Sequence, residues 1–128
     1  MKTLLMLFAL MVPHHGTGIS YDLEAPLITL KGTVTEWRWA NPHVTLFIDV
    51  KDANGKIVNW GFEHSNVNTL ARQGYNRNTL KIGQEVTVVA HPSRGGAEVA
   101  LIRKVVLSDG KETLQRDQAG APQQREER

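Results

Sequence analysis

Cysteine is absent from this chain of 128 residues, which excludes a disulfide, a thiolate metal site, a cysteine nucleophile and a lipidated cysteine anchor. The fold must therefore depend on packing and hydrogen bonding alone. An excess of one charge is also missing, because 15 Lys and Arg residues are opposed by 13 Asp and Glu residues, for a net charge of +2. A charge so close to balance does not favour nucleic acid as a partner.

The motifs of the common enzyme classes are missing as well. The chain has no Gly-rich phosphate loop, no Gly-x-Ser-x-Gly nucleophile elbow and no His-Glu-x-x-His pattern. We therefore predict that the protein is not an enzyme. Its 41% of hydrophobic residues is typical of a soluble globular chain with one modest core, and 128 residues leave room for one domain.

The first residues have the layout of a secretory signal. Lys2 supplies a positive charge, an apolar run follows over residues 4–12, and Pro13 ends a run that is too short to span a bilayer. An N-terminal core helix is the alternative, although no polar face interrupts the run. We expect a signal peptide over residues 1–18, cleaved between 13 and 18. The mature protein would then be periplasmic or secreted, with no membrane contact.

Strands are predicted throughout the first half of the domain. Residues 27–37 alternate apolar and polar side chains, with Gly32 at an apolar position, which favours a bend or a bulge in a long curved strand. Residues 43–50 and 56–64 flank Asp52-Ala53-Asn54-Gly55, a sequence typical of a three-residue hairpin loop. These two segments are therefore predicted to form a hairpin.

The hairpin loop sets the register of its two strands. Pairing Asp52 with Lys56 produces one continuous apolar face across both strands, and a shift by one residue would set Val44, Leu46 and Ile48 opposite Glu63, Gly61 and Asn59. The pairs on the apolar face are Val50–Val58, Ile48–Trp60, Leu46–Phe62 and Val44–His64. We predict that Trp60 and Phe62 lie in the core and that His64 lies at the barrel mouth, on the face away from His43.

A short helix is predicted after the hairpin. Ser65 is placed to cap it, and Gly74 is placed to end it. Its apolar face carries Val67, Leu70 and Ala71. The helix would be about two turns long.

Two further strands, over residues 85–91 and 97–107, complete the pattern. Three strands, a helix and two strands are the order of the five-stranded OB barrel. We therefore predict a mainly β, OB-like barrel over residues 19–110, with one short helix between strands 3 and 4. Residues 111–128 are rich in Gln, Arg and Glu with no apolar period, and we expect a disordered polar tail there.

Several short motifs occur along the chain in a characteristic order. They are His14-His15, Tyr21-Asp22, Leu30-Lys31-Gly32-Thr33-Val34, Trp37, Asn41-Pro42-His43, Trp60-Gly61-Phe62-Glu63 and Thr79-Leu80-Lys81-Ile82-Gly83. In this order and spacing the chain resembles domain of unknown function family 6152, small exported bacterial proteins, from about His14 to Gly110. The resemblance implies export and a single domain, and it supplies no reaction.

OB barrels bind ligands on the outer face of strands 2 and 3, framed by the loops that join strands 1 and 2 and strands 4 and 5. The predicted register makes Glu63 a diagonal neighbour of His43 on that face. The candidate ligand-binding residues on the face and in the two loops are Trp39, Asn41, His43, Phe47, Glu63, His91 and Arg94. Imidazole, carboxylate, guanidinium and indole groups are typical of small-ligand and metal sites.

Two alternatives remain open for these loop residues. Asn41-Pro42 is equally consistent with a turn that starts strand 2, with His43 as an ordinary rim residue. A bulge beyond Val34 would turn either Trp37 or Trp39 inward.

Two classes of function are compatible with the sequence. The first is a periplasmic module that binds an unknown small ligand or a periplasmic protein on the outer face of strands 2 and 3. The second is a copper or zinc protein in which His14 and His15 join His43 or His91, with Glu63 as an oxygen ligand. Histidine pairs also occur in unstructured tails, so we predict the binding module first and the metal protein as the alternative.

Overall fold

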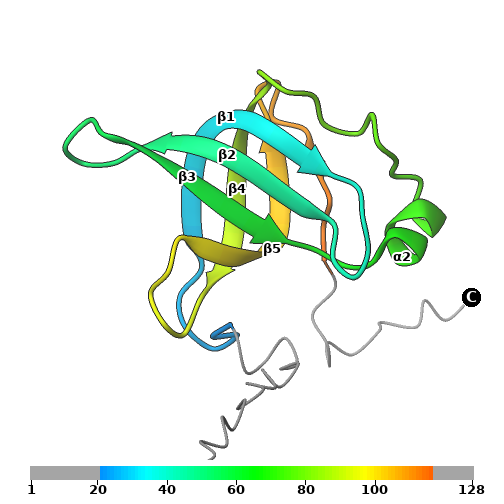
Figure 1. Cartoon of the computed structure of the whole chain (residues 1–128), viewed down its shortest axis with the longest axis horizontal. Helices are drawn as coiled ribbons and strands as arrows, with labels where there is room; N and C mark the ends of the chain where they lie inside the picture. Colours follow the sequence, from blue (N-terminus) through cyan, green and yellow to red (C-terminus); the bar gives the residue numbers. More distant parts are fainter. Residues whose placement is uncertain (1–20, 117–128) are drawn as a thin grey trace, which may run out of the picture.

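Five strands close into a barrel in the part of the chain that this computed structural model describes, residues 21–116 (Figure 1). They are β1 (Ile28–Arg38), β2 (Thr45–Lys51), β3 (Ile57–Glu63), β4 (Glu85–Pro92) and β5 (Val99–Leu107). Antiparallel pairing joins β3 to β2, β2 to β1, β1 to β4 and β4 to β5, and a parallel pairing of β3 with β5 closes the ring. The predicted mainly β, OB-like barrel is confirmed.

Strand β1 pairs with two strands in turn, and Gly32 lies near the point where it passes from β4 to β2. A Cβ on Gly32 would stand 2.2 Å from the carbonyl oxygen of Asp49, so only glycine permits this approach of the β2 backbone. The β-bulge lies farther along, between Val34 and Glu36. Gly32 therefore lets the backbones of β1 and β2 come close together. The bulge reverses which face of the sheet the side chains at the end of β1 point to.

The β2–β3 hairpin has the predicted register. Leu46 pairs with Phe62 and Ile48 pairs with Trp60, and the loop closes with the backbone N–H of Asp52 donating to the carbonyl of Lys56 at 2.8 Å. Phe62 is fully buried, as predicted, whereas Trp60 packs against the core but stays partly exposed. The hairpin extends beyond the barrel, so its outer half has less of the core to cover it (Figure 1).

Helix α2 (Val67–Arg72) lies between β3 and β4 in sequence, as predicted, and at one end of the barrel (Figure 1). Its N-cap is Asn66, whose side chain accepts from the backbone N–H of Thr69 at 2.8 Å. The prediction of Ser65 as the cap is wrong by one residue, because the Ser65 carbonyl still accepts from Val44 and belongs to the hairpin ladder. Leu70 is the buried residue of the helix.

The chain returns to the barrel after β5. Strand β6 (Glu112–Thr113) pairs with β5, and the next residue, Leu114, is fully buried in the core. The prediction of a disordered tail from residue 111 is therefore wrong for residues 111–116, because one buried leucine among polar residues produces no periodic signal. The predicted signal at residues 1–18 and the rest of the predicted tail, 117–128, lie outside the described residues.

The core fills the barrel with aliphatic side chains and one phenylalanine. Its members are Val34, Leu46, Ile48, Val50, Phe62, Leu80, Val86, Val88, Ala90, Ala100, Ile102, Val105 and Leu114. Within residues 21–116, we find no helix that has both the length and the apolar character needed to cross a bilayer.

Candidate functional site

A row of paired residues runs across the outside of the barrel. Arg38 of β1 pairs with Thr45 of β2, Thr45 with Glu63 of β3, Glu63 with Leu101 of β5, and Leu101 with His91 of β4. Paired residues point to the same side of a sheet, so these five side chains share the outer face. The two ends of the row differ, because Arg38 is exposed whereas Leu101 and His91 are buried.

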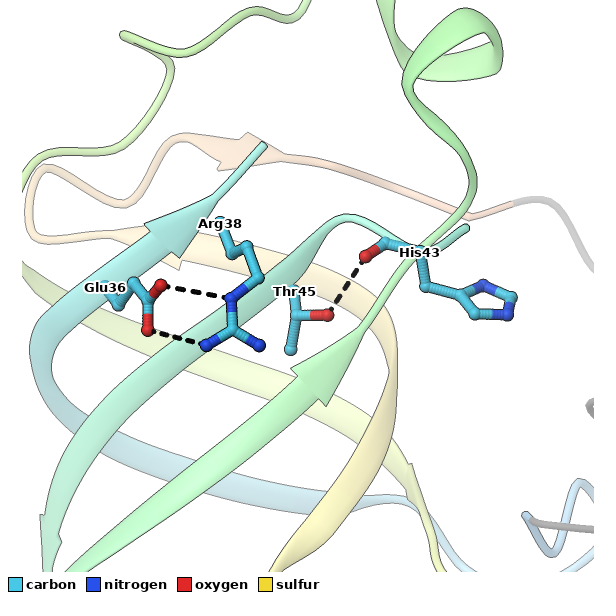
Figure 2. A network of polar contacts seen from close by, with 4 residues as sticks. All are labelled: Glu36, Arg38, His43 and Thr45. Carbon is cyan, nitrogen blue, oxygen red and sulfur yellow. Dashed lines mark hydrogen bonds and ion pairs between the residues drawn. The ribbon is translucent and has the colours of Figure 1, made fainter. Parts of the chain in front are cut away.

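The Arg38 end of the row carries an ordered guanidinium group. Its Nε and Nη2 donate to the two carboxylate oxygens of Glu36, both at 3.1 Å, while its Cζ lies 4.7 Å from the centre of the Phe47 ring. Figure 2 shows the paired Glu36 and Arg38, with the imidazole of His43 pointing away from both. Because Nε and Nη2 both donate to Glu36, Nη1 is the nitrogen of Arg38 that could donate to an acceptor on a ligand.

The ring of Phe47 lies next to Gly61, which has no side chain. A Cβ on Gly61 would stand 3.3 Å from a ring carbon of Phe47 and 3.7 Å from a methyl group of Val99, which is 40% exposed. Glycine at 61 therefore allows the ring to lie flat on β3. We call the surface formed by Glu36, Arg38, Phe47, Gly61 and Val99 the Phe47 patch.

Tyr21 covers the row near Glu63. It is 4% exposed, forms an isolated bridge with Ser93, and donates a hydrogen bond from its hydroxyl to the Glu63 carboxylate. Burial, and after it the charge and the hydrogen bond of Glu63, raise the pKa of the Tyr21 hydroxyl, so it stays a neutral donor. Glu63 is therefore engaged by Tyr21, and within residues 21–116 the contact of His43 is with the carbonyl of His64 rather than with Glu63 as predicted.

The predicted loop residues mainly hold the β1–β2 loop in place. Asn41 accepts from the first backbone N–H of α2, that of Val67, at 2.9 Å, and the Asn41–Pro42 peptide bond is cis. Trp37 packs against the core and donates from its indole nitrogen to a backbone carbonyl at 3.0 Å, and Trp39 lies 6.1 Å from it, ring centre to ring centre. Trp37 is thus the inward residue of the pair that the sequence left open.

His43 is half-buried, and a contact with a backbone carbonyl sets the orientation of its ring. Its Nδ1 lies 3.2 Å from the carbonyl oxygen of His64. A carbonyl oxygen only accepts, so Nδ1 carries the hydrogen and Nε2 of the neutral ring is left as the lone-pair nitrogen. His64 itself is buried opposite Val44, as predicted, and its Nε2 donates to the carbonyl of Leu114 at 2.9 Å.

With this geometry established, the chain can be compared with known proteins. A family model described as a family of unknown function, DUF6152, matches residues 4–102. The chain belongs to this family. A comparison with curated proteins found no match. The DUF6152 match spans β1 to β4 and the start of β5. It confirms the family resemblance, and the family description assigns no activity.

The last two predicted site residues of this DUF6152 protein come from β4 and the loop after it. Arg94 is exposed in the β4–β5 loop, as predicted. His91 belongs to β4 rather than to the loop, and it is only 9% exposed, so it does not frame an open ligand face. Burial, and after it the positive charges of Arg103 and Arg116, lower the pKa of His91.

The predicted metal ligands of the DUF6152 chain are only partly brought together. Among residues 21–116, no three His, Asp or Glu side chains lie close enough to hold a metal ion. Glu63 and His91 are separated on the row by Leu101, and His43 lies just before β2, two residues from Thr45, the partner of Glu63. His14 and His15 lie outside the described residues.

Glu36 is the functional candidate that the sequence prediction missed. Strict alternation along β1 would place it on the inner face with Val34, but the bulge between these two residues turns Glu36 outward, opposite Phe47. The sequence did contain a signal for the bulge, because strict alternation would bury the Glu36 carboxylate, and carboxylates are almost never buried without a partner.

Proposed function

We propose that this protein is a small exported binding module of the OB type, and that it holds its ligand on the outer face of β2 and β3. The Phe47 patch is the observation that supports the proposal. It presents a partly exposed aromatic ring and an exposed valine beside a guanidinium group that Glu36 holds in one orientation. It occupies the face on which OB barrels bind their ligands.

The chemistry of the patch favours an uncharged ligand. The charges of Glu36 and Arg38 compensate each other, so no net charge is left to attract an ion. A flat or apolar group would pack on Phe47 and Val99, and a hydrogen-bond acceptor next to it would meet Nη1 of Arg38. Because the two-bond contact with Glu36 already orders Arg38, binding would lose little further side-chain entropy.

Export is the second part of the proposal. It is supported by the charged and apolar layout of residues 1–18. Mass spectrometry of the protein recovered from the periplasm or the medium tests this part. A mature chain that begins between residues 14 and 19 is expected, and a full-length chain confined to the cytoplasm would contradict it.

An NMR titration tests the binding face. Phenol and cellotriose, two uncharged ring compounds, would be titrated into the uniformly 15N-labelled protein, and we expect shifts of the backbone amides of Arg38, Phe47 and Gly61. Phe47→Ala should weaken binding at least about tenfold, which is 1.4 kcal/mol. Ile82→Ala is the control, because Ile82 is 77% exposed and lies outside the patch. Shifts confined to β4 and β5, or equal binding by Phe47→Ala, would contradict the proposal.

Copper or zinc binding is the second candidate, and the orientation of His43 is the observation that favours it. Metal-ligating histidines commonly donate one ring N–H to a carbonyl and bind through the other nitrogen, as the contact with His64 would allow. Calorimetric titration of Cu(II) and Zn(II) into the mature protein and into His43→Ala tests it. We expect micromolar binding that the substitution weakens at least about tenfold. Binding that is unaffected by His43→Ala would exclude His43 as a ligand.

A further inference from the structure

A hollow lies on the outside of the barrel, away from the Phe47 patch. It has a volume of about 350 Å³, which is near the lower end of small-molecule pockets. Strands β4 and β5 form its floor, and the returning segment with β6 forms one wall. It is lined by Leu27, Val89, Arg103, Lys104, Glu112, Gln115 and Arg116.

Two arginines are held side by side in this pocket by backbone contacts. The backbone N–H of Arg116 donates to the carbonyl of Arg103 at 2.9 Å, and Nη1 of Arg103 donates to the carbonyl of Arg116. The second contact uses one nitrogen of Arg103 and no side-chain atom of Arg116. Both arginines line the pocket, and the contacts that hold them together involve no carboxylate.

The positive charge in the pocket is only partly compensated. Lys104 donates to Glu112 at 2.5 Å, and these two groups neutralise each other. Within residues 21–116, no ion pair is recorded for Arg103 or for Arg116. Two like charges are thus left side by side in one half-buried pocket, where both would attract a bound anion.

The unpaired atoms point to the same conclusion. Nη1 of Arg116 is buried and has no hydrogen-bond partner, and the same holds for Nδ1 of the nearby His91. Buried polar groups without a partner are rare, and of these two residues it is Arg116 that lines the pocket. Arg103 and Arg116 contribute, after burial, to the lowered pKa of His91, so the potential in this region is positive.

We propose that this pocket binds a small molecule carrying a carboxylate or phosphate group, with Arg116 and Arg103 holding the anionic oxygens. Arginine forks match both groups with paired hydrogen bonds. Leu27 and Val89 add an apolar wall, so an acid with a short hydrocarbon part fits better than a bare ion. The ligand of this pocket is distinct from the uncharged ligand of the Phe47 patch, and neither proposal depends on the other.

Calorimetric titration of the full chain tests the proposal with three probes at constant ionic strength: inorganic phosphate, acetate and hexanoate. We expect saturable binding of at least one probe. If the ligand is an organic acid, hexanoate will bind at least about tenfold more tightly than acetate. If it is a phosphate compound, inorganic phosphate will bind more tightly than either carboxylate. Absence of saturable binding of all three probes would overturn the proposal.

Three variants locate the site. Arg116→Gln should weaken binding at least about tenfold, and Glu112→Gln should strengthen it by removing the negative charge at the pocket wall. Arg77→Gln is the control, because Arg77 is exposed in the turn after α2. Because Arg116→Gln keeps both backbone contacts to Arg103, it should fold like the wild type, which circular dichroism would verify. Equal affinity in Arg116→Gln and Arg77→Gln, or weaker binding by Glu112→Gln, would refute the assignment.

Discussion

Replacing Leu114 with alanine measures how much the returning C-terminal segment contributes to the fold. The side chain is fully buried in the core, and alanine would leave a cavity there. Leucine-to-alanine changes at such sites destabilise a protein by about 2–5 kcal/mol. For a domain of about 100 residues this corresponds to a fall in melting temperature of about 10–25 °C.

The effect of Leu114→Ala can be attributed to the side chain alone. Leucine and alanine both adopt the left-handed backbone at this position, where φ is 51°, at a similar energetic cost. Both also keep the backbone bonds, in which the Leu114 N–H donates to the Tyr75 hydroxyl and the Leu114 carbonyl accepts from His64, each at 2.9 Å. What differs is the apolar surface that leaves the core.

Thermal and urea denaturation, followed by circular dichroism, are the assays for this change. Leu23→Ala is the matched control, because Leu23 is 45% exposed and its truncation should change the free energy of unfolding by less than about 0.5 kcal/mol. If Leu114→Ala were as stable as Leu23→Ala, residues 111–116 would not belong to the folded unit and the reasoning about the core would be refuted.

Three further perturbations test the barrel itself. Gly32→Ala should destabilise the protein by about 1–3 kcal/mol or more in urea denaturation, because the new methyl group meets the backbone of β2. Phe62→Ala should cost about 3–5 kcal/mol and Phe47→Ala well under that, and equal losses would contradict the assignment of the two residues to opposite faces. Burial lowers the pKa of His64 below its unfolded value of about 6.5, so its contribution to stability is complete above that pH and is lost as the pH falls toward the folded pKa. Unfolding free energies at pH 7.5 and pH 5 should therefore differ less in His64→Gln than in the wild type, and an unchanged difference would show that His64 is not responsible.

The hairpin was predictable because two independent signals agree. The sequence Asp-Ala-Asn-Gly specifies a short loop, and the register that this loop imposes also places Leu46, Ile48 and Val50 of β2 on one face. The burial of Trp60 was overestimated because alternation specifies only the face to which a side chain points. How far the barrel extends over that face depends on the pairing of β3 with β5, which joins segments far apart in sequence.

The contacts that the sequence did not predict are those made by single residues of irregular segments. Leu114 and Tyr21 both pack onto the barrel from segments without alternation, and neither belongs to a repeating pattern that burial could be inferred from. The bulge in β1 is a similar case, because one unpaired residue inverts the facing of every residue after it. Glu36 and Arg38 reach the outer face only through this inversion.

The position of Tyr21 determines which part of the outer face remains for a ligand. Its hydroxyl donates to the carboxylate of Glu63, which the register places at the centre of the face, and the hydroxyl is kept neutral by burial and by that carboxylate. The half of the row beyond Glu63 is closed as well, since Leu101 and His91 are buried. The accessible polar groups of the row are thus those of the Arg38 end, next to the ring of Phe47. We therefore expect a ligand on β2 and β3 to be recognised by the Phe47 patch, and an anion to be recognised by Arg103 and Arg116 on the other strands. The variants Phe47→Ala and Arg116→Gln should consequently each weaken one kind of binding and leave the other unchanged.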